Sequence, residues 1–318
     1  MNYIQQAYKG KNDLWMFIVT AILISGIFVL NFIFYLMTSK EDMDAMYDMM
    51  KEVPSNLSLI INLVPFAFLL GLLFVMVKFV HQRSIISLTT SRSKPDWTRT
   101  LFSFLLITMI TLGTFAISYY ADPSQIELQF NPVKFGILFL ISIILFPFQI
   151  GLEEYLFRGY FMQQIGIIVK NRWFPLVVTS VLFGIAHSAN PEVAEMGFVI
   201  MIFYIGTGFL LGIMTLMDEG LELALGFHLG NNLLAALLIT SDWSALQTDA
   251  IFRYTAEQAN STVVDIIMPV FVVYPIILFV LAKKYKWTNW KEKLFGSVVE
   301  PPKEDYKVLD DINKIGTL

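Results

Sequence analysis

Long apolar stretches recur along the chain and constrain its fold more than any other feature. An apolar helix of about 20 residues is long enough to cross the hydrocarbon core of a bilayer. Such stretches lie at about residues 14–37, 57–80, 100–120, 133–157, 174–189, 196–217, 221–240 and 263–282. Only 15% of the 318 residues are charged, whereas about 25% of the residues in soluble proteins are charged. We therefore predict an all-α polytopic membrane protein with about eight transmembrane helices.

Lysine and arginine residues are divided unevenly between two alternating sets of connections. The first set holds 17 of them and consists of the N-terminal segment, residues 81–99, residues 158–172 and the tail after residue 282. The second set holds only four and consists of residues 38–56, 121–134, 190–195 and 241–262. Cytoplasmic loops carry an excess of these two residue types, so we expect both termini in the cytoplasm.

The composition excludes several kinds of site. The chain has no cysteine, and so it has no disulfide framework, no thiolate nucleophile and no cysteine-based zinc site. It also lacks a basic aromatic stripe and a glycine-rich phosphate loop, so we expect no nucleic acid partner.

The first three spans carry almost no ionisable residues. We therefore divide the chain into an N-terminal region (1–132), a core with the intramembrane ionisable residues (133–240) and a last span with a cytoplasmic tail (241–318).

Two adjacent glutamates, Glu153 and Glu154, lie inside the apolar run 146–159. An ionised carboxylate at membrane depth costs at least a few kcal/mol, so a compensating role is expected. Glu154 and Arg158 are four residues apart with the acid first, which is the favourable order for an ion pair on a helix. Glu153 is rotated by about 100° from Glu154 and stays available as a general base. A Glu–Arg anchor at the membrane surface explains the same pair without any catalysis.

The depth of the glutamates in the membrane is open at this point. As a helix, the largely apolar stretch from residue 133 to residue 169 would be about 55 Å long, far more than one span needs. Hydropathy alone puts Glu153 near the cytoplasmic end, whereas His187 lies well along the next span. Either Pro147 kinks the fourth span, or the helix enters later and carries the glutamates deeper. A site shared with the histidines requires the deeper placement.

Two of the three histidines also lie in apolar runs. Phe183 and His187 are four residues apart, which lets the phenylalanine ring pack against the imidazole. His228 and Asn232 have the same spacing and can both donate hydrogen bonds. That pair suits an oxyanion clamp better than half of a metal site. Each histidine can instead be a core residue bonded to a neighbouring helix. His81 opens the basic loop, where we expect it to be solvated.

Three short motifs follow one another on successive apolar helices, Glu153-Glu154-x-x-x-Arg158, Phe183-x-x-x-His187 and His228-x-x-x-Asn232. In this order they resemble the CAAX protease and bacteriocin-processing family (CPBP, formerly Abi), whose eukaryotic relatives are the type II CAAX prenyl proteases. The resemblance covers about residues 133–240. It implies an all-helical intramembrane endopeptidase in a bacterial cell membrane. Its expected partners are the lipid bilayer and a membrane-associated protein or peptide substrate; no oligomeric state is implied.

The resemblance also implies roles for individual residues. Glu153 and His187 would activate water, and His228 with Asn232 would stabilise the oxyanion. Glu154 and Arg158 would support the site. No cofactor is firmly implied. Zinc remains an option, because Glu153, His187 and His228 have the composition of a zinc-binding set, although the chain has no H-E-x-x-H motif.

Two other kinds of function fit the same residues. Some members of the resembled family give bacteriocin self-immunity, so the main alternative is a non-catalytic membrane regulator or immunity protein. A proton-coupled transporter would use glutamate and histidine as a relay. A transporter of that kind is typically built from pseudo-symmetric halves, which the polar-poor first half of this chain does not offer.

Overall fold

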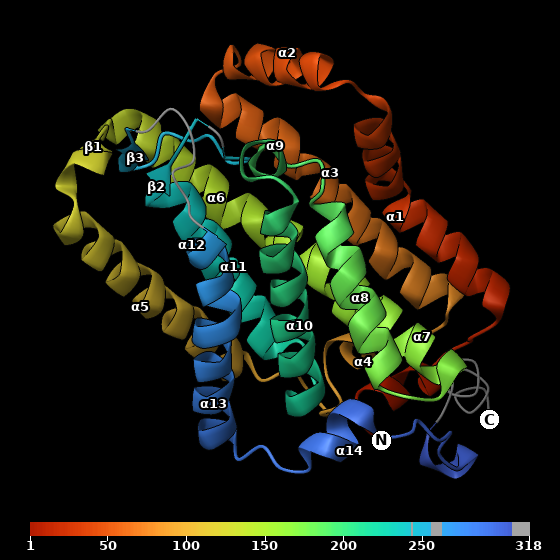
Figure 1. Cartoon of the computed structure of the whole chain (residues 1–318). Coiled ribbons are helices and arrows are strands. Elements are labelled where there is room, and N and C mark those ends of the chain that lie inside the picture. The colour runs from red at the N-terminus through yellow and green to blue at the C-terminus, as the bar shows by residue number, and fades with distance from the viewer. Residues whose placement is uncertain (243, 256–262, 307–318) are drawn as a thin grey trace.

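The computed structural model describes residues 1–242, 244–255 and 263–306, and it is built mainly from helices (Figure 1). Within those ranges, six helical segments are long and apolar enough to cross a membrane: Leu14–Met37, Ser55–Val80, Trp97–Ala121, Pro132–Val169, Phe198–Asp218 and Ile266–Tyr285. They coincide with six of the predicted spans. The other two correspond to α8 (Trp173–Ala186) and α11 (Glu222–Leu237), which have only 14 and 16 residues. The chain is an all-α polytopic integral membrane protein, and the predicted count of eight spans is not confirmed.

The long segments are composed of the following elements. The first three are α1 (Leu14–Met37), α3 (Ser55–Val75) with the π-helix η2 (Met76–Val80), and α5 (Trp97–Ala121). The fourth joins α6 (Pro132–Glu153), the π-helix η4 (Glu154–Phe161) and α7 (Met162–Val169). The fifth joins η5 (Phe198–Ile200) to α10 (Met201–Asp218), and the last combines α12 (Val263–Met268), η6 (Pro269–Val273) and α13 (Tyr274–Tyr285). Short helices between or beyond them are η1 (Ile4–Lys9), α2 (Lys40–Lys51), α4 (Ile85–Thr89), η3 (Pro123–Gln125), α9 (Pro191–Met196), α14 (Trp290–Phe295) and η7 (Lys303–Asp305).

The outer helices expose many apolar side chains, an arrangement that is stable in the hydrocarbon core of a bilayer but not in water. In α1, just 11% of the most apolar window is buried within the protein, and residues such as Leu30 and Met37 point outward. In water, an apolar surface of this extent would be strongly unfavourable. By contrast, 56% of the corresponding window of α10 is buried. α10 therefore lies inside the helix bundle, and α1 faces lipid.

The N-terminal segment and the basic loop meet at one end of the bundle, which we call the terminal end (Figure 1, bottom). The backbone N–H of Tyr3 donates to Glu219, and Thr90 forms an isolated β-bridge with Gly220. A second bridge joins Asn171 to Ser297. The connections that are rich in lysine and arginine thus share one end, as their alternation along the chain predicts. The compartment that this end faces stays a prediction.

The opposite end, which we call the loop end, carries α2, α9 and a small sheet (Figure 1, top). Strand β1 (Ile126–Leu128) pairs antiparallel with β3 (Phe252–Tyr254), and β3 pairs parallel with β2 (Ile239–Thr240). The sequence analysis did not predict this sheet, because strands of two or three residues leave no alternating pattern. The sheet joins the connection before α6 to the segment after α11.

A single long helix carries both glutamates. It runs from Pro132 to Val169 and continues through Pro147. Its π-helical segment begins at Glu154, and such a segment shifts the angular positions of the side chains that follow; π-helical turns are frequent at functional sites. The glutamates lie well inside this helix, and their depth in the membrane stays a prediction.

Close helix contacts bring the remaining elements onto the long helix. α11 packs against both α5 and α6, and α10 packs against α8. Two glycines permit these approaches. A Cβ atom on Gly226 would lie 2.0 Å from the carbonyl oxygen of Thr100, and one on Gly208 would lie 2.7 Å from that of Ser180. A larger residue at either position would force the helices apart.

One prediction of exposure is wrong. His81 was expected to be solvated, but it is buried, with 1% of its surface exposed. Its Nε2 atom lies 2.9 Å from the hydroxyl of Tyr160 and 3.2 Å from that of Thr20, and its Nδ1 donates to the carbonyl of Lys11 at 2.9 Å. The segment between η1 and α1 therefore binds the ring, a contact between distant parts of the chain that local sequence does not reveal.

Candidate active site

Glu154 and Arg158 form the ion pair that their spacing predicts. Arg158 Nη1 donates to Glu154 Oε1 at 2.9 Å, and both side chains are fully buried. Arg158 Nη2 also donates to the carbonyl of Gly208 at 3.3 Å. The guanidinium lies over the ring of Phe183, with Cζ 4.2 Å from the ring centroid. A buried charge needs partners of this kind, and they fix the pair where η4, α8 and α10 meet.

His228 joins this pair from α11. Its Nδ1 lies 2.8 Å from Glu154 Oε1, and since a carboxylate oxygen accepts, the ring nitrogen is the donor. The Nε2 atom of the same ring lies 3.6 Å from Glu153 Oε2. The imidazole is thus held between the two neighbouring carboxylates, with Glu154 fixing its orientation.

A chain of amide side chains holds Glu153. Gln149 Nε2 donates to Glu153 Oε1, and Gln149 Oε1 accepts from Asn232 Nδ2 at 2.9 Å. Asn232 Oδ1 in turn accepts from Asn231 Nδ2 at 3.2 Å. Glu153 Oε2 is buried and accepts no hydrogen bond from any described residue. Glu154 Oε2 is also buried without a donor among the described residues, but it is Glu153 Oε2 that lies beside Nε2 of His228.

His187 reaches the cluster from the end of α8. The helix ends at Ala186, three residues before the predicted limit of the span, and His187 is its C-cap. Its Nδ1 donates to the carbonyl of Phe183 at 2.7 Å, so the neutral ring keeps Nε2 as an acceptor. The predicted packing of Phe183 on His187 is confirmed, with ring centroids 4.6 Å apart. The Phe183 ring also lies 5.9 Å from that of His228, which places both imidazoles against one phenylalanine.

The turn that follows His187 is tied to other parts of the protein. Tyr204 of α10 stacks on the His187 ring, with a centroid distance of 4.6 Å and an interplanar angle of 23°. The hydroxyl of Tyr204 accepts from Asn190 Nδ2 at 3.2 Å and interacts electrostatically with the nearby carboxyl of Glu192. Glu192 Oε1 accepts from the backbone N–H of Ala245 at 2.8 Å, and burial raises the pKa of this carboxyl. His187 is thereby connected to the loop end.

All six site residues predicted from the sequence lie in or beside this cluster, but two of its members were missed. Gln149 could have been found, because it is a polar residue one turn before Glu153 in an apolar run. Tyr204 gave no usable signal, because it is one of 13 tyrosines and its helix is apolar throughout. The stacking on His187 depends on how α10 packs against α8.

The predicted zinc set does not have a ready metal geometry. In the part of the chain that the structure describes, no three His, Asp or Glu side chains are grouped so that they could hold a metal ion. The Nδ1 atoms of His187 and His228 are both engaged, by a carbonyl and by Glu154. We derive no reaction step through zinc, and a zinc set of Glu153, His187 and His228 stays an untested option.

Comparison with protein families gives a match for residues 133–234, to the family described as type II CAAX prenyl endopeptidase, Rce1-like. The matched segment contains Glu153, Glu154, Arg158, His187, His228 and Asn232. This segment of the chain is similar to the Rce1-like family. The match confirms the resemblance that the three motifs indicate. The Rce1-like segment runs from the start of α6 into α11, so every helix of the cluster falls inside it.

A similar protein is the uncharacterized protein YyaK of Bacillus subtilis (strain 168). It is 29% identical over 247 residues, which are 76% of this chain and 83% of YyaK. The similarity is thus longer than the Rce1-like segment alone. No solved structure matches the chain, and the predicted division at residues 132 and 240 stays a prediction.

Proposed function

We propose that this chain is an intramembrane endopeptidase that hydrolyses a peptide bond in a membrane-associated protein or peptide. The family match supports an endopeptidase of the CAAX type. The observation that carries the proposal is the free oxygen of Glu153. It is buried, accepts no hydrogen bond from a described residue and lies 3.6 Å from His228 Nε2. A buried carboxylate oxygen without a hydrogen-bond donor destabilises the folded protein. Groups of this kind are typical of functional sites.

In the proposed reaction, Glu153 and His187 activate water. Glu153 Oε2 takes a proton from the water while His187 Nε2 orients it, and the water oxygen attacks the carbonyl carbon of the substrate. The C–N bond then breaks, and the proton held by Glu153 passes to the leaving amine. The amide chain from Asn232 through Gln149 supports this role. Gln149 donates to Oε1 of Glu153 and is itself held by Asn232, which leaves Oε2 of Glu153 for the water.

His228 and Asn232 are proposed to stabilise the oxyanion. A protonated ring donates through Nδ1 to Glu154 and presents Nε2–H to the developing oxyanion. Asn232 Nδ2 carries a second hydrogen besides the one donated to Gln149. Both donors approach from one helix, α11.

We further propose that the terminal end faces the cytoplasm of a bacterial cell. The division of lysine and arginine between the two sets of connections, 17 against four, supports this orientation.

Membrane proteomics tests the proposed activity. Membranes that contain the wild type, Glu153→Gln or Glu41→Gln would be incubated and searched for new protein N-termini by mass spectrometry. Glu41 is exposed on α2, so its substitution controls for the loss of one carboxylate. New termini should appear with the wild type and Glu41→Gln but not with Glu153→Gln. Identical sets of termini in all three samples would favour a non-catalytic regulator or immunity protein.

A further inference from the structure

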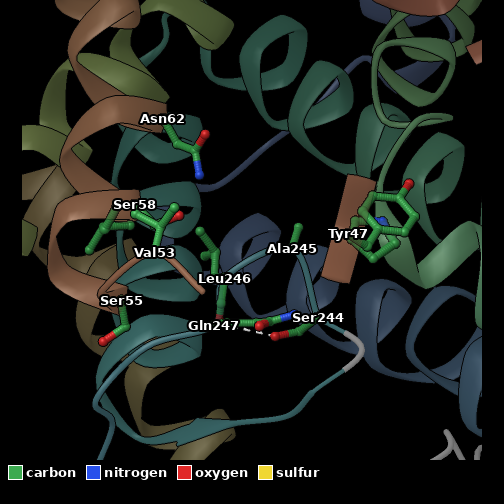
Figure 2. A pocket seen from close by; sticks show the side chains of 11 residues that line it. Tyr47, Val53, Ser55, Ser58, Asn62, Ser244, Ala245, Leu246 and Gln247 are labelled. Atoms are coloured by element: carbon green, nitrogen blue, oxygen red, sulfur yellow. Dashed lines mark hydrogen bonds between the residues drawn. The ribbon is translucent and has the colours of Figure 1, made fainter. Parts of the chain in front are cut away.

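A cavity of about 270 Å³ lies at the loop end, outside the cluster described above. Figure 2 shows Ser55, Ser58 and Asn62 along α3 on one side of it, and a loop with Ser244 and Gln247 on the other. Tyr47 of α2 and the first residue of α9 complete its wall. The volume is close to the lower limit of ligand pockets, roughly 300 Å³. A short segment of a larger molecule therefore fits it better than a whole drug-sized ligand does.

The lining of the cavity is polar but uncharged. Of the described residues that form its wall, none carries a charge; hydroxyl and amide groups alternate with apolar side chains such as Leu59 and Leu246. Hydroxyls and amides both donate and accept, as the peptide backbone does. A charged group would lose its hydration here without gaining a counter-ion, which is strongly unfavourable. The lining therefore fits an uncharged stretch of peptide.

Tyr47 links this wall to the turn that carries His187. Its hydroxyl donates to the carbonyl of Ala189 at 3.1 Å, two residues after His187. Although Tyr47 belongs to α2, it is therefore fixed against the end of α8.

The 244–247 loop, across the cavity from α3, is also linked to the residues around His187. The backbone N–H of Ala245, which lines the cavity, donates to Glu192 of α9, and Glu192 interacts electrostatically with Tyr204, the tyrosine that stacks on His187. Pro191, the first residue of α9, lines the cavity directly. Tyr47 of α2 and the 244–247 loop are thus attached, through separate contacts, to the residues around His187.

From these two links we infer that the cavity is a subsite for an uncharged segment of the peptide substrate, on the loop-end side of His187. The inference rests on the proposed endopeptidase function. A peptide seated between α3 and the 244–247 loop would run alongside the turn 187–191 toward the cluster. Sequences with neutral residues next to the scissile bond would then be preferred over sequences with lysine or glutamate there.

The first test measures kinetics on two sets of short internally quenched peptides, which differ only in having neutral or charged residues beside the scissile region. Wild type should cleave the neutral set with the lower KM. Ser58→Trp, which fills the cavity, should raise KM for the neutral set about tenfold or more, the lower end of what a pocket contact contributes, and leave kcat unchanged. Ile61→Trp is the matched control, because Ile61 is on the same helix but 58% exposed toward lipid. Equal KM values for wild type and Ser58→Trp would overturn the inference.

The second test measures binding without turnover, so that failure of the function and failure of the subsite are separated. The chain has no cysteine, and Asn62→Cys in a Glu153→Gln background gives one reporter in the cavity. The neutral peptides should slow its labelling by a water-soluble maleimide, and the charged peptides should not. Met49→Cys, exposed on α2, should label at the same rate with either set. Absence of cleavage by the wild type would refute the endopeptidase proposal, whereas unprotected labelling of Asn62→Cys would refute the subsite.

Discussion

His228 donates a hydrogen bond to Glu154 at 2.8 Å, although the two residues are 74 positions apart in the sequence. The same oxygen of Glu154 accepts from Arg158 at 2.9 Å. One carboxylate oxygen therefore joins the first and third motifs, and the neighbouring Glu153 stays free for chemistry. The two adjacent glutamates have different surroundings, so their substitutions should have different effects.

We predict that Glu153→Ala abolishes peptide cleavage and leaves the protein folded. This change removes a base whose Oε2 accepts no hydrogen bond from a described residue, and it leaves the Glu154–Arg158 ion pair intact. Cleavage and thermal unfolding would be measured on the purified protein in detergent. Retained turnover in this variant would contradict the assignment of Glu153 as the base.

We predict that Glu154→Ala and Arg158→Ala lower stability as well as activity. Each leaves a buried charge without its partner, which typically costs about 3–5 kcal/mol. The free energy of unfolding should fall more for these variants than for Glu153→Ala. A stably folded Glu154→Ala protein without activity would instead point to Glu154 as the catalytic base.

We predict that Asn232→Ala retains weak activity and that His187→Ala retains almost none. Loss of one oxyanion donor typically lowers the rate about 10²–10³-fold, whereas the loss of His187 removes the group that orients the water. Gln149→Ala should behave like Asn232→Ala, because both residues belong to the chain that positions Glu153. Single-turnover rates at saturating substrate would compare the three variants. Full activity of Gln149→Ala would show that the chain is not needed.

We predict that the purified enzyme works without a stoichiometric transition metal. The measurement is metal content by mass spectrometry, together with activity before and after chelation. One zinc per chain, with activity lost on stripping and restored by zinc, would make His187 and His228 ligands and overturn the oxyanion assignment.

We predict that Glu192 makes the loop end less stable as the pH rises. Burial raises the pKa of this carboxyl in the folded protein, so the folded state holds the proton more tightly than the unfolded state. This contribution to stability is present at low pH and is lost as the pH rises from about 4.3, the ordinary glutamate value, through the raised pKa. The protection factor of the Ala245 amide, which is its exchange rate relative to the intrinsic rate at the same pH, should fall over that window in the wild type and much less in Glu192→Gln. The same fall in both proteins would rule out Glu192 as the titrating group.

The sequence predicted what depends on local pattern and missed what depends on packing between helices. Hydropathy located the long spans, and four-residue spacing located the Glu154–Arg158 pair and the packing of Phe183 on His187. The rotation of α10 that brings Tyr204 onto His187 has no local signature, because every face of that helix is apolar. For the same reason His81 was misplaced: its position in a basic loop indicated solvent, whereas the segment around Lys11 covers it.

The shortness of α8 and α11 has a consequence for the surrounding lipid. At 1.5 Å per residue these helices are about 21 and 24 Å long, whereas the hydrocarbon core is about 30 Å thick. A bilayer adapts to such hydrophobic mismatch by thinning around the short helices. α8 exposes side chains such as Val177 and Leu182 on its outer side and ends at His187, so the lipid should be thinned beside His187. Thinning there shortens the path by which water and a polar peptide bond reach the interior of the membrane.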